Sequence, residues 1–216
     1  MADNQFSREM FNKMPLVGIM RNFKQSDIEN ILPAYADSGL NTIEITMNSA
    51  GAVESIEYIA KNFAGRLNVG AGTVLTKEDL EIALNAGAQF IVTPVVNLQI
   101  IDRCRQLKIP IFCGAYTPTE IFTAWNAGSE MVKVFPMVSD PIEYIKALRG
   151  PLPHIKLLPT GGVNLDNCDS FFRAGASGIG AGGQLFDKDM ISRKDWSALH
   201  HHFSQFVKKI SSVVHA

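Results

Sequence analysis

The chain has 216 residues, of which 46% are hydrophobic and 19% are charged, so it can build the core of one domain, which we expect to span residues 1–216. Its 20 basic and 21 acidic residues are scattered and give a net charge of -1. This balance excludes the basic surface of a nucleic-acid binder or of a protein drawn to anionic membranes, so the expected partner is a small molecule.

The first fourteen residues carry several charged side chains and no uninterrupted apolar stretch. They match neither a signal peptide nor a membrane span, and we therefore expect a cytoplasmic protein. The three cysteines, Cys104, Cys113 and Cys168, are widely spaced and odd in number. This spacing argues against a disulfide framework and against a thiolate metal site.

From Pro15 onward, short apolar runs alternate with longer amphipathic stretches, the rhythm of repeated βα units around a parallel sheet. The predicted strands are Leu16–Met20, Thr42–Thr46, Asn68–Ala71, Phe90–Val92, Ile109–Phe112, Met131–Phe135, Ile155–Leu158 and Gly178–Gly180. Helical patterns cover Asp27–Asp37, Ala52–Asn62, Lys77–Ala86, Thr119–Ala127, Pro141–Leu148 and Leu165–Ala174. Four of these helices run into Gly39, Gly87, Gly128 and Gly175, where a left-handed residue would end each helix.

Eight such units in about 200 residues favour a TIM (β/α)8 barrel over an open doubly wound sheet. The stretch Trp196–Val214 is predicted to be the closing helix. A short N-terminal helix over Arg8–Lys13, with Asn4 or Ser7 as its cap, would cover the amino end of the barrel.

The sixth predicted strand carries a lysine where a barrel needs an inward side chain. Period-two alternation in Met131–Phe135 places Lys133 on the face opposite Val132 and Val134, so it points into the barrel. Burial disfavours the charged ammonium and favours the neutral amine, which can attack a carbonyl carbon. The alternatives are a lysine that reaches the rim and a structural ion pair.

The second predicted strand places a carboxylate in the same interior. Ile43 and Ile45 face the helices, so Glu44 faces the barrel axis from the wall opposite Lys133. A carboxylate within reach of an imine-bound substrate can act as a general acid and base. A buried ion pair between Glu44 and Lys133 without a catalytic role is the alternative.

Glycine-rich segments follow the seventh and eighth strands, at Pro159–Leu165 and Gly180–Gly183. Loops at these two positions of a barrel present backbone N–H groups to a phosphate. Helix capping by Asn164 and Asp166 is the structural alternative for the first loop. After the third strand, Thr73 could bind a substrate carboxylate or hydroxyl.

The consecutive residues His200, His201 and His202 diverge around a helix and cannot share one ion, so we interpret them as surface residues. No other spacing typical of metal ligands occurs on the expected active-site face. We therefore expect a reaction that needs neither a metal nor a cofactor.

Together these features resemble the family of 2-dehydro-3-deoxy-phosphogluconate (KDPG) and 4-hydroxy-2-oxoglutarate (KHG) aldolases, over about Pro15 to Leu185. The segments that carry the resemblance are Ile43–Thr46, Val69–Leu75, Val92–Pro94, Ile109–Ile111, Val132–Pro136 and Pro159–Gly162. Members of this family are class I aldolases that form small (β/α)8 barrels and homotrimers.

The resemblance implies a Schiff base on Lys133, acid and base catalysis by Glu44, and cleavage of KDPG or KHG to pyruvate and glyceraldehyde 3-phosphate or glyoxylate. The other implied substrate contacts are Thr73, Pro94, Phe135 and Thr160, with phosphate held around Gly161, Gly162, Gly182 and Gly183.

Two positions depart from the pattern that the resemblance implies. Asn48 stands where many phosphogluconate aldolases carry a carboxylate-binding arginine, and Arg21 after the first strand is the candidate to replace it. This combination is more similar to the 2-dehydro-3-deoxy-6-phosphogalactonate branch, so that epimer is the alternative substrate. Gly183 stands where many relatives carry a serine, which removes one phosphate contact.

Two further classes remain open. A phosphosugar isomerase or synthase on the same barrel would keep the glycine-rich loops but would not need an inward lysine. A catalytically silent member would bind a keto-acid phosphate as a regulatory ligand.

Overall fold

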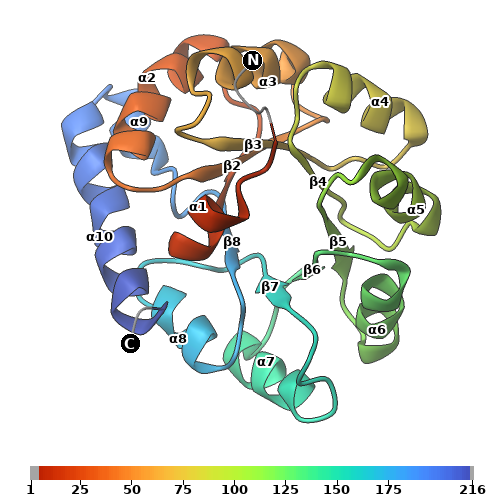
Figure 1. The fold of residues 1–216 in the computed structure, drawn as a ribbon. Coiled ribbons are helices and arrows are strands. Elements are labelled where there is room, and N and C mark those ends of the chain that lie inside the picture. Colours follow the sequence, from red (N-terminus) through yellow and green to blue (C-terminus); the bar gives the residue numbers. More distant parts are fainter. Residues whose placement is uncertain (1–4, 215–216) are drawn as a thin grey trace.

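The computed structural model describes residues 5–214 and confirms the predicted (β/α)8 class. Eight parallel strands form one sheet in the order β7-β6-β5-β4-β3-β2-β1-β8. A parallel bridge from Thr160 to Gly180 joins the two edges of this sheet. The sheet therefore closes into a barrel, and the helices that follow the strands form a ring around it (Figure 1).

The strands are β1 (Leu16–Met20), β2 (Thr42–Thr46), β3 (Asn68–Gly72), β4 (Phe90–Val92), β5 (Ile111–Ala115), β6 (Met131–Val134), β7 (Leu157–Pro159) and β8 (Ile179–Ala181). The helices are α1 (Arg8–Lys13), α2 (Gln25–Asp37), α3 (Ala52–Asn62), α4 (Lys77–Asn85), α5 (Leu98–Leu107), α6 (Pro118–Ala127), α7 (Pro141–Arg149), α8 (Cys168–Arg173), α9 (Lys188–Ser192) and α10 (Trp196–Val214). No helix within residues 5–214 is long and apolar enough to cross a bilayer.

Capping residues explain where several helices begin and end. Thr76 and Thr117 each form a capping box with the acidic residue three positions later, at the starts of α4 and α6. The four predicted glycine stops, Gly39, Gly87, Gly128 and Gly175, all have φ between 97° and 109°. A side chain is unfavourable in that left-handed conformation, and the prediction is confirmed.

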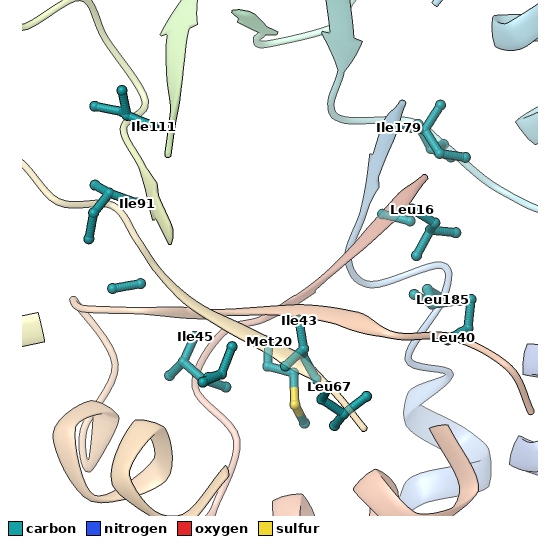
Figure 2. Packing of buried hydrophobic residues seen from close by; sticks show 14 of the residues in the cluster. Leu16, Met20, Leu40, Ile43, Ile45, Leu67, Ile91, Ile111, Ile179 and Leu185 are labelled. Carbon is teal, nitrogen blue, oxygen red and sulfur yellow. The ribbon is translucent and has the colours of Figure 1, made fainter. Parts of the chain in front are cut away.

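Apolar side chains on the outer faces of the strands form the larger core, between barrel and helices. In β2, Ile43 and Ile45 project from the same side of the strand, beside Met20 and Leu67 (Figure 2). All five residues of β2 are buried, because its inner face lines the barrel while its outer face packs under the helices.

A second, smaller core fills the amino end of the barrel. Its buried members are Phe6, Phe11, Val17, Phe90, Val92, Phe112, Met131 and Leu158. Helix α1 lies across this end of the barrel (Figure 1). The ring centroids of Phe6 and Phe90 are 5.3 Å apart, and those of Phe11 and Phe112 are 5.6 Å apart. The predicted N-terminal helix therefore caps the barrel, and it also supplies part of its core.

The cap of α1 is Ser7, whose Oγ accepts a hydrogen bond from the backbone N–H of Met10 at 3.2 Å. Asn4, the other predicted cap, lies outside the described residues. The side chain of Asn68 in β3 bonds to the backbone N–H and carbonyl of Ser7, at 2.8 and 3.0 Å. These bonds attach the N-terminal segment to the barrel.

Some predicted boundaries were wrong. The predicted helix Leu165–Ala174 begins only at Cys168. Oδ1 of Asn164 accepts from the backbone N–H of Asp166 at 2.9 Å, and this side-chain bond holds the preceding residues in a turn. Strand β5 begins at Ile111 instead of Ile109, after a proline that has no N–H for the ladder.

Smaller shifts affect four other strands. Strand β3 continues one residue past its predicted end, to Gly72. Strand β6 ends at Val134, which leaves Phe135 in the following loop. Strand β7 covers Leu157–Pro159 and β8 covers Ile179–Ala181, each displaced by one or two residues from its predicted range. The sequence patterns define no bounds for α5 or α9.

Candidate active site

Lys133 and Glu44 meet inside the barrel, as the alternation of their strands predicts. Lys133 stands on β6, between β5 and β7, and Glu44 stands on β2, between β1 and β3. Both residues are buried, and Nζ of Lys133 lies 4.0 Å from Oε1 of Glu44. An amine and a carboxylate thus face each other above an apolar core.

Glu44 is held in an environment that favours its neutral form. Burial raises the pKa of its carboxyl above the ordinary value, and the positive charges of Lys133 and Arg21 offset part of that rise. Oε1 is buried and has no hydrogen-bond partner among the described residues. A buried oxygen of this kind is available to a ligand or to a proton.

Gly72 explains how the Glu44 side chain fits. The two residues lie on neighbouring strands, with Thr46 paired to Gly72. A Cβ atom on Gly72 would overlap Oε1, Cδ and Cγ of Glu44. The absence of a side chain at this position on β3 therefore makes room for the carboxylate.

The ring of Phe135 lies beside the amine. Its centroid is 5.3 Å from Nζ of Lys133, within the range of a cation–π contact. The ring is half-buried and lines a cavity that opens at the carboxyl ends of the strands. It therefore forms an apolar wall next to the nucleophile.

This cavity has a volume of about 840 Å³ and gathers most of the predicted site residues. Those on its wall are Arg21, Lys133, Phe135, Thr160, Gly161, Gly162, Gly182 and Gly183. They come from the ends of strands that are far apart in sequence, because the carboxyl ends of all barrel strands face the same side.

Three predicted substrate contacts do not lie on the cavity wall. Asn48 is exposed in the turn after β2. Thr73 is half-buried after β3, with φ of 56°. Pro94 is half-buried after β4, and its carbonyl packs against Gly114. All three follow strands at the active-site rim, and their contact with substrate stays a prediction.

Three lysines that the sequence analysis did not select also line the cavity. Lys24 follows β1, while Lys188 and Lys194 follow β8, and all three are exposed. Their side chains form no hydrogen bond or ion pair with another described residue. The sequence shows that these lysines follow the first and eighth strands closely. That they line the same cavity becomes clear only from the closed barrel.

The glycine-rich loops present free backbone donors. The N–H groups of Gly162, Gly183 and Gln184 donate hydrogen bonds to no other described residue, and all three residues line the cavity. Gly180 leaves space for the side chain of Thr160, which a Cβ at that position would contact. This end of the cavity combines amide donors with lysine charges, a chemistry that suits an anion.

Within residues 5–214, no group of three or more His, Cys, Asp or Glu side chains is arranged to hold a metal ion. His201 is exposed, whereas His200 and His202 are half-buried. The three histidines lie on α10, outside the cavity wall.

A family model described as KDPG and KHG aldolase matches residues 8–202. The chain is 34% identical over 175 residues to the 2-dehydro-3-deoxy-6-phosphogalactonate aldolase of Escherichia coli strain K12, an alignment that covers 81% of this chain and 85% of that protein. It is 33% identical over 193 residues to the 2-dehydro-3-deoxy-phosphogluconate aldolase of Haemophilus influenzae, with coverage of 88% and 90%. A solved structure named "Native KDPGal structure" superposes with a TM-score of 0.86 at 30% identity, covering 98% of this chain and 100% of that one. This chain belongs to the KDPG and KHG aldolase family.

Proposed function

We propose that this protein is a class I aldolase in which Lys133 forms a Schiff base with the substrate and Glu44 transfers protons. The observation that carries the proposal is the 4.0 Å separation of Nζ and Oε1 inside the barrel, beside a cavity open to solvent. A lysine amine is the group that condenses with a keto carbon, and a neighbouring carboxyl supplies general acid and base catalysis.

The reaction begins when Nζ of Lys133 attacks the 2-keto carbon. The resulting carbinolamine takes up one proton from the solvent and loses water, which gives an iminium ion. Glu44 takes the proton of the C4 hydroxyl, the C3–C4 bond breaks, and its electron pair moves toward the iminium nitrogen. An aldehyde leaves, and an enamine of pyruvate remains on the lysine. Protonation of the enamine carbon and hydrolysis release pyruvate and restore the amine.

The substrate is a phosphorylated 2-keto-3-deoxy sugar acid. Its phosphate would bind at the amide donors of Gly162, Gly183 and Gln184, with the cavity lysines supplying positive charge. Arg21 would bind the substrate carboxylate, because it lines the cavity and its charge opposes part of the rise in the pKa of Glu44. These contacts would orient the keto carbon toward Lys133.

KDPG is the principal proposed substrate, and KHG, a shorter keto acid without phosphate, is also proposed. The products would be pyruvate with glyceraldehyde 3-phosphate, or pyruvate with glyoxylate. The second candidate is 2-dehydro-3-deoxy-6-phosphogalactonate, which differs at C4. Asn48 in place of an arginine, with Arg21 on the cavity wall, favours this epimer. Initial rates with both epimers would choose between them.

Borohydride reduction in the presence of pyruvate, followed by mass spectrometry of the intact protein, tests the mechanism. The native chain should gain a pyruvate-sized adduct that Lys133→Ala does not gain. Glu44→Gln should keep the adduct and lose about 10²- to 10⁴-fold in turnover. No adduct on the native chain, under conditions where another class I aldolase is labelled, would reject the lysine mechanism.

The same experiment separates the two other classes. An isomerase or synthase on this barrel would bind phosphosugars without trapping pyruvate. A silent regulatory member would trap pyruvate on Lys133 and cleave neither epimer. An adduct together with turnover supports the aldolase.

We also propose a homotrimer of this single-domain chain, acting in the cytoplasm. Six large apolar side chains after β3, β4 and β6 and on α4, α5 and α6 are 46% to 54% exposed: Leu75, Ile82, Val95, Leu98, Phe122 and Val138. The side chain of Asn97 donates to the carbonyl of Leu75 at 3.2 Å, so the first two loops lie together. Contact between copies would cover this surface.

Light scattering after gel filtration tests the assembly. The native protein should have three times the mass of the 23.7 kDa chain. Val95→Glu combined with Leu98→Glu should reduce this mass, because charges would be buried at the interface. A native mass of one chain would reject the trimer.

A further inference from the structure

Helix α10 lies along the side of the barrel that carries both glycine-rich loops. It packs against α2, α8 and α9 (Figure 1). Its buried side chains are Leu199, Phe203, Phe206 and Ile210. Beside this apolar face, His202 and Lys209 reach the segments that follow β8 and β7.

His202 bonds to the loop after β8. Its Nε2 lies 3.0 Å from the carbonyl oxygen of Gln184. Because a carbonyl oxygen only accepts, Nε2 must carry the hydrogen. The imidazole packs edge-on against the buried ring of Phe206, with centroids 5.2 Å apart and an interplanar angle of 80°. The ring is therefore held in the orientation that the hydrogen bond needs.

The bonded carbonyl belongs to a peptide unit that is fixed at its other end as well. The N–H of Leu185 donates to the carbonyl of Gly182 at 2.8 Å, and the N–H of Phe186 donates to the same oxygen at 3.0 Å. The N–H groups of Gly183 and Gln184 have no acceptor among the described residues. His202 thus completes a turn whose free amide donors lie at the cavity.

Lys209 acts in the same way on the segment after β7. Its Nζ donates to the carbonyl oxygens of Leu165 and Asp166, at 2.8 and 2.7 Å. Nζ also lies 3.2 Å from Oδ1 of Asp169. The side chain of Asn167, next in the chain, donates to the carbonyl of Gly162 at 2.9 Å. The contacts therefore run from α10 to the glycine loop.

We propose that His202 and Lys209 are positioning residues that hold the two glycine-rich loops in the conformation that binds the substrate phosphate. This inference rests on the phosphate site in the proposed function. Loops that are already ordered lose less conformational entropy when the anion binds, and donors fixed before binding hold it more tightly. Neither side chain lines the cavity, so each acts through the loop that it contacts.

Phosphate affinity and pyruvate chemistry can be measured separately in His202→Leu and Lys209→Met. Calorimetric titration with inorganic phosphate measures the affinity of the loops for an anion in the absence of any reaction. The KM for the phosphorylated substrate measures the effect of the loops during turnover. The rate of borohydride trapping with pyruvate measures the reactivity of Lys133 without the phosphate site. The matched controls are His201→Leu and Lys208→Met, which change exposed neighbours on the same helix.

His202→Leu should raise the Kd for phosphate and the KM by roughly five-fold, the effect of one lost hydrogen bond. Lys209→Met, which loses two hydrogen bonds, should raise both by at least as much. Pyruvate trapping and both controls should stay at the native values. His202→Gln and Lys209→Arg keep a donor and should recover most of the affinity. An unchanged phosphate Kd, or a parallel fall in pyruvate trapping, would overturn the inference.

The failure of the proposed function would look different. If the native chain traps no pyruvate, the lysine mechanism is wrong whatever the phosphate titration shows. Weaker phosphate binding in His202→Leu and Lys209→Met, with native binding in the controls, would then still support the positioning role.

Discussion

The amine of Lys133 and the carboxylate of Glu44 approach to 4.0 Å from opposite walls of the barrel, and Oε1 of Glu44 has no hydrogen-bond partner in residues 5–214. In a purely structural ion pair, such a buried oxygen would be expected to have its hydrogen bonds satisfied. Here the separation leaves both groups able to interact with a third molecule. The predictions below test the parts of the structure that hold this pair in place.

Gly72→Ala should displace the Glu44 side chain, because the new methyl group would occupy the position of the carboxylate. Turnover should fall by about 10²-fold, the effect of a misplacement near 1 Å. Steady-state kinetics measures the loss. Gly150→Ala is the matched control, since a Cβ there meets only an ordinary contact at 3.6 Å, from the carbonyl of Ala147. Native turnover in Gly72→Ala would show that Glu44 does not need this space.

Arg21→Gln should move the acid limb of the pH–kcat profile to higher pH. Burial raises the pKa of Glu44, and the Arg21 charge opposes that rise. Removing the charge raises the pKa further, so the base becomes ionised only at higher pH. Arg21→Lys keeps the charge and should keep the limb near its native position. A limb that moves to lower pH in Arg21→Gln would contradict the assignment of Glu44 as the titrating base.

Lys24→Met and Lys188→Met should each raise the KM for a phosphorylated substrate, because each removes a charge from the cavity wall. Both side chains are exposed, so the expected change is roughly two- to five-fold at low ionic strength. The difference from the native enzyme should shrink as salt is added. Lys61→Met, on the exposed surface of α3 outside the cavity wall, is the control. Equal effects of all three substitutions would exclude a local role for the cavity lysines.

Phe6→Ala should destabilise the barrel although it lies far from the chemistry. Phe6 is 7% exposed and contacts the rings of Phe11, Phe90 and Phe112. Loss of a buried phenyl ring costs about 3 to 5 kcal/mol. Urea unfolding at a fixed protein concentration measures the change. Glu9→Ala, at an exposed position on α1, is the control, and its free energy of unfolding should stay within about 0.5 kcal/mol of the native value. An equally small effect of Phe6→Ala would show that the barrel does not depend on this ring for its stability.

Much of the barrel follows from patterns that are local in the sequence. Strands β1, β2 and β4 and helices α1, α3 and α10 have the predicted bounds, because alternation, helical periodicity and caps act over a few residues. The inward direction of Glu44 and Lys133 follows from the same rule. Side chains alternate along any strand, whatever its neighbours are.

Other features depend on contacts between distant segments. Three features exist only once the barrel closes and its helices pack. They are the packing of Phe6 in the amino end, the position of Lys24 and Lys188 on one cavity wall, and the bond from His202 to Gln184. Helix α8 begins three residues after its predicted start because the side chain of Asn164 forms turn hydrogen bonds that compete with the helix. Helical periodicity in the sequence does not detect such side-chain bonds. Local chemistry thus determines which face a side chain occupies, whereas chain closure determines which side chains it meets.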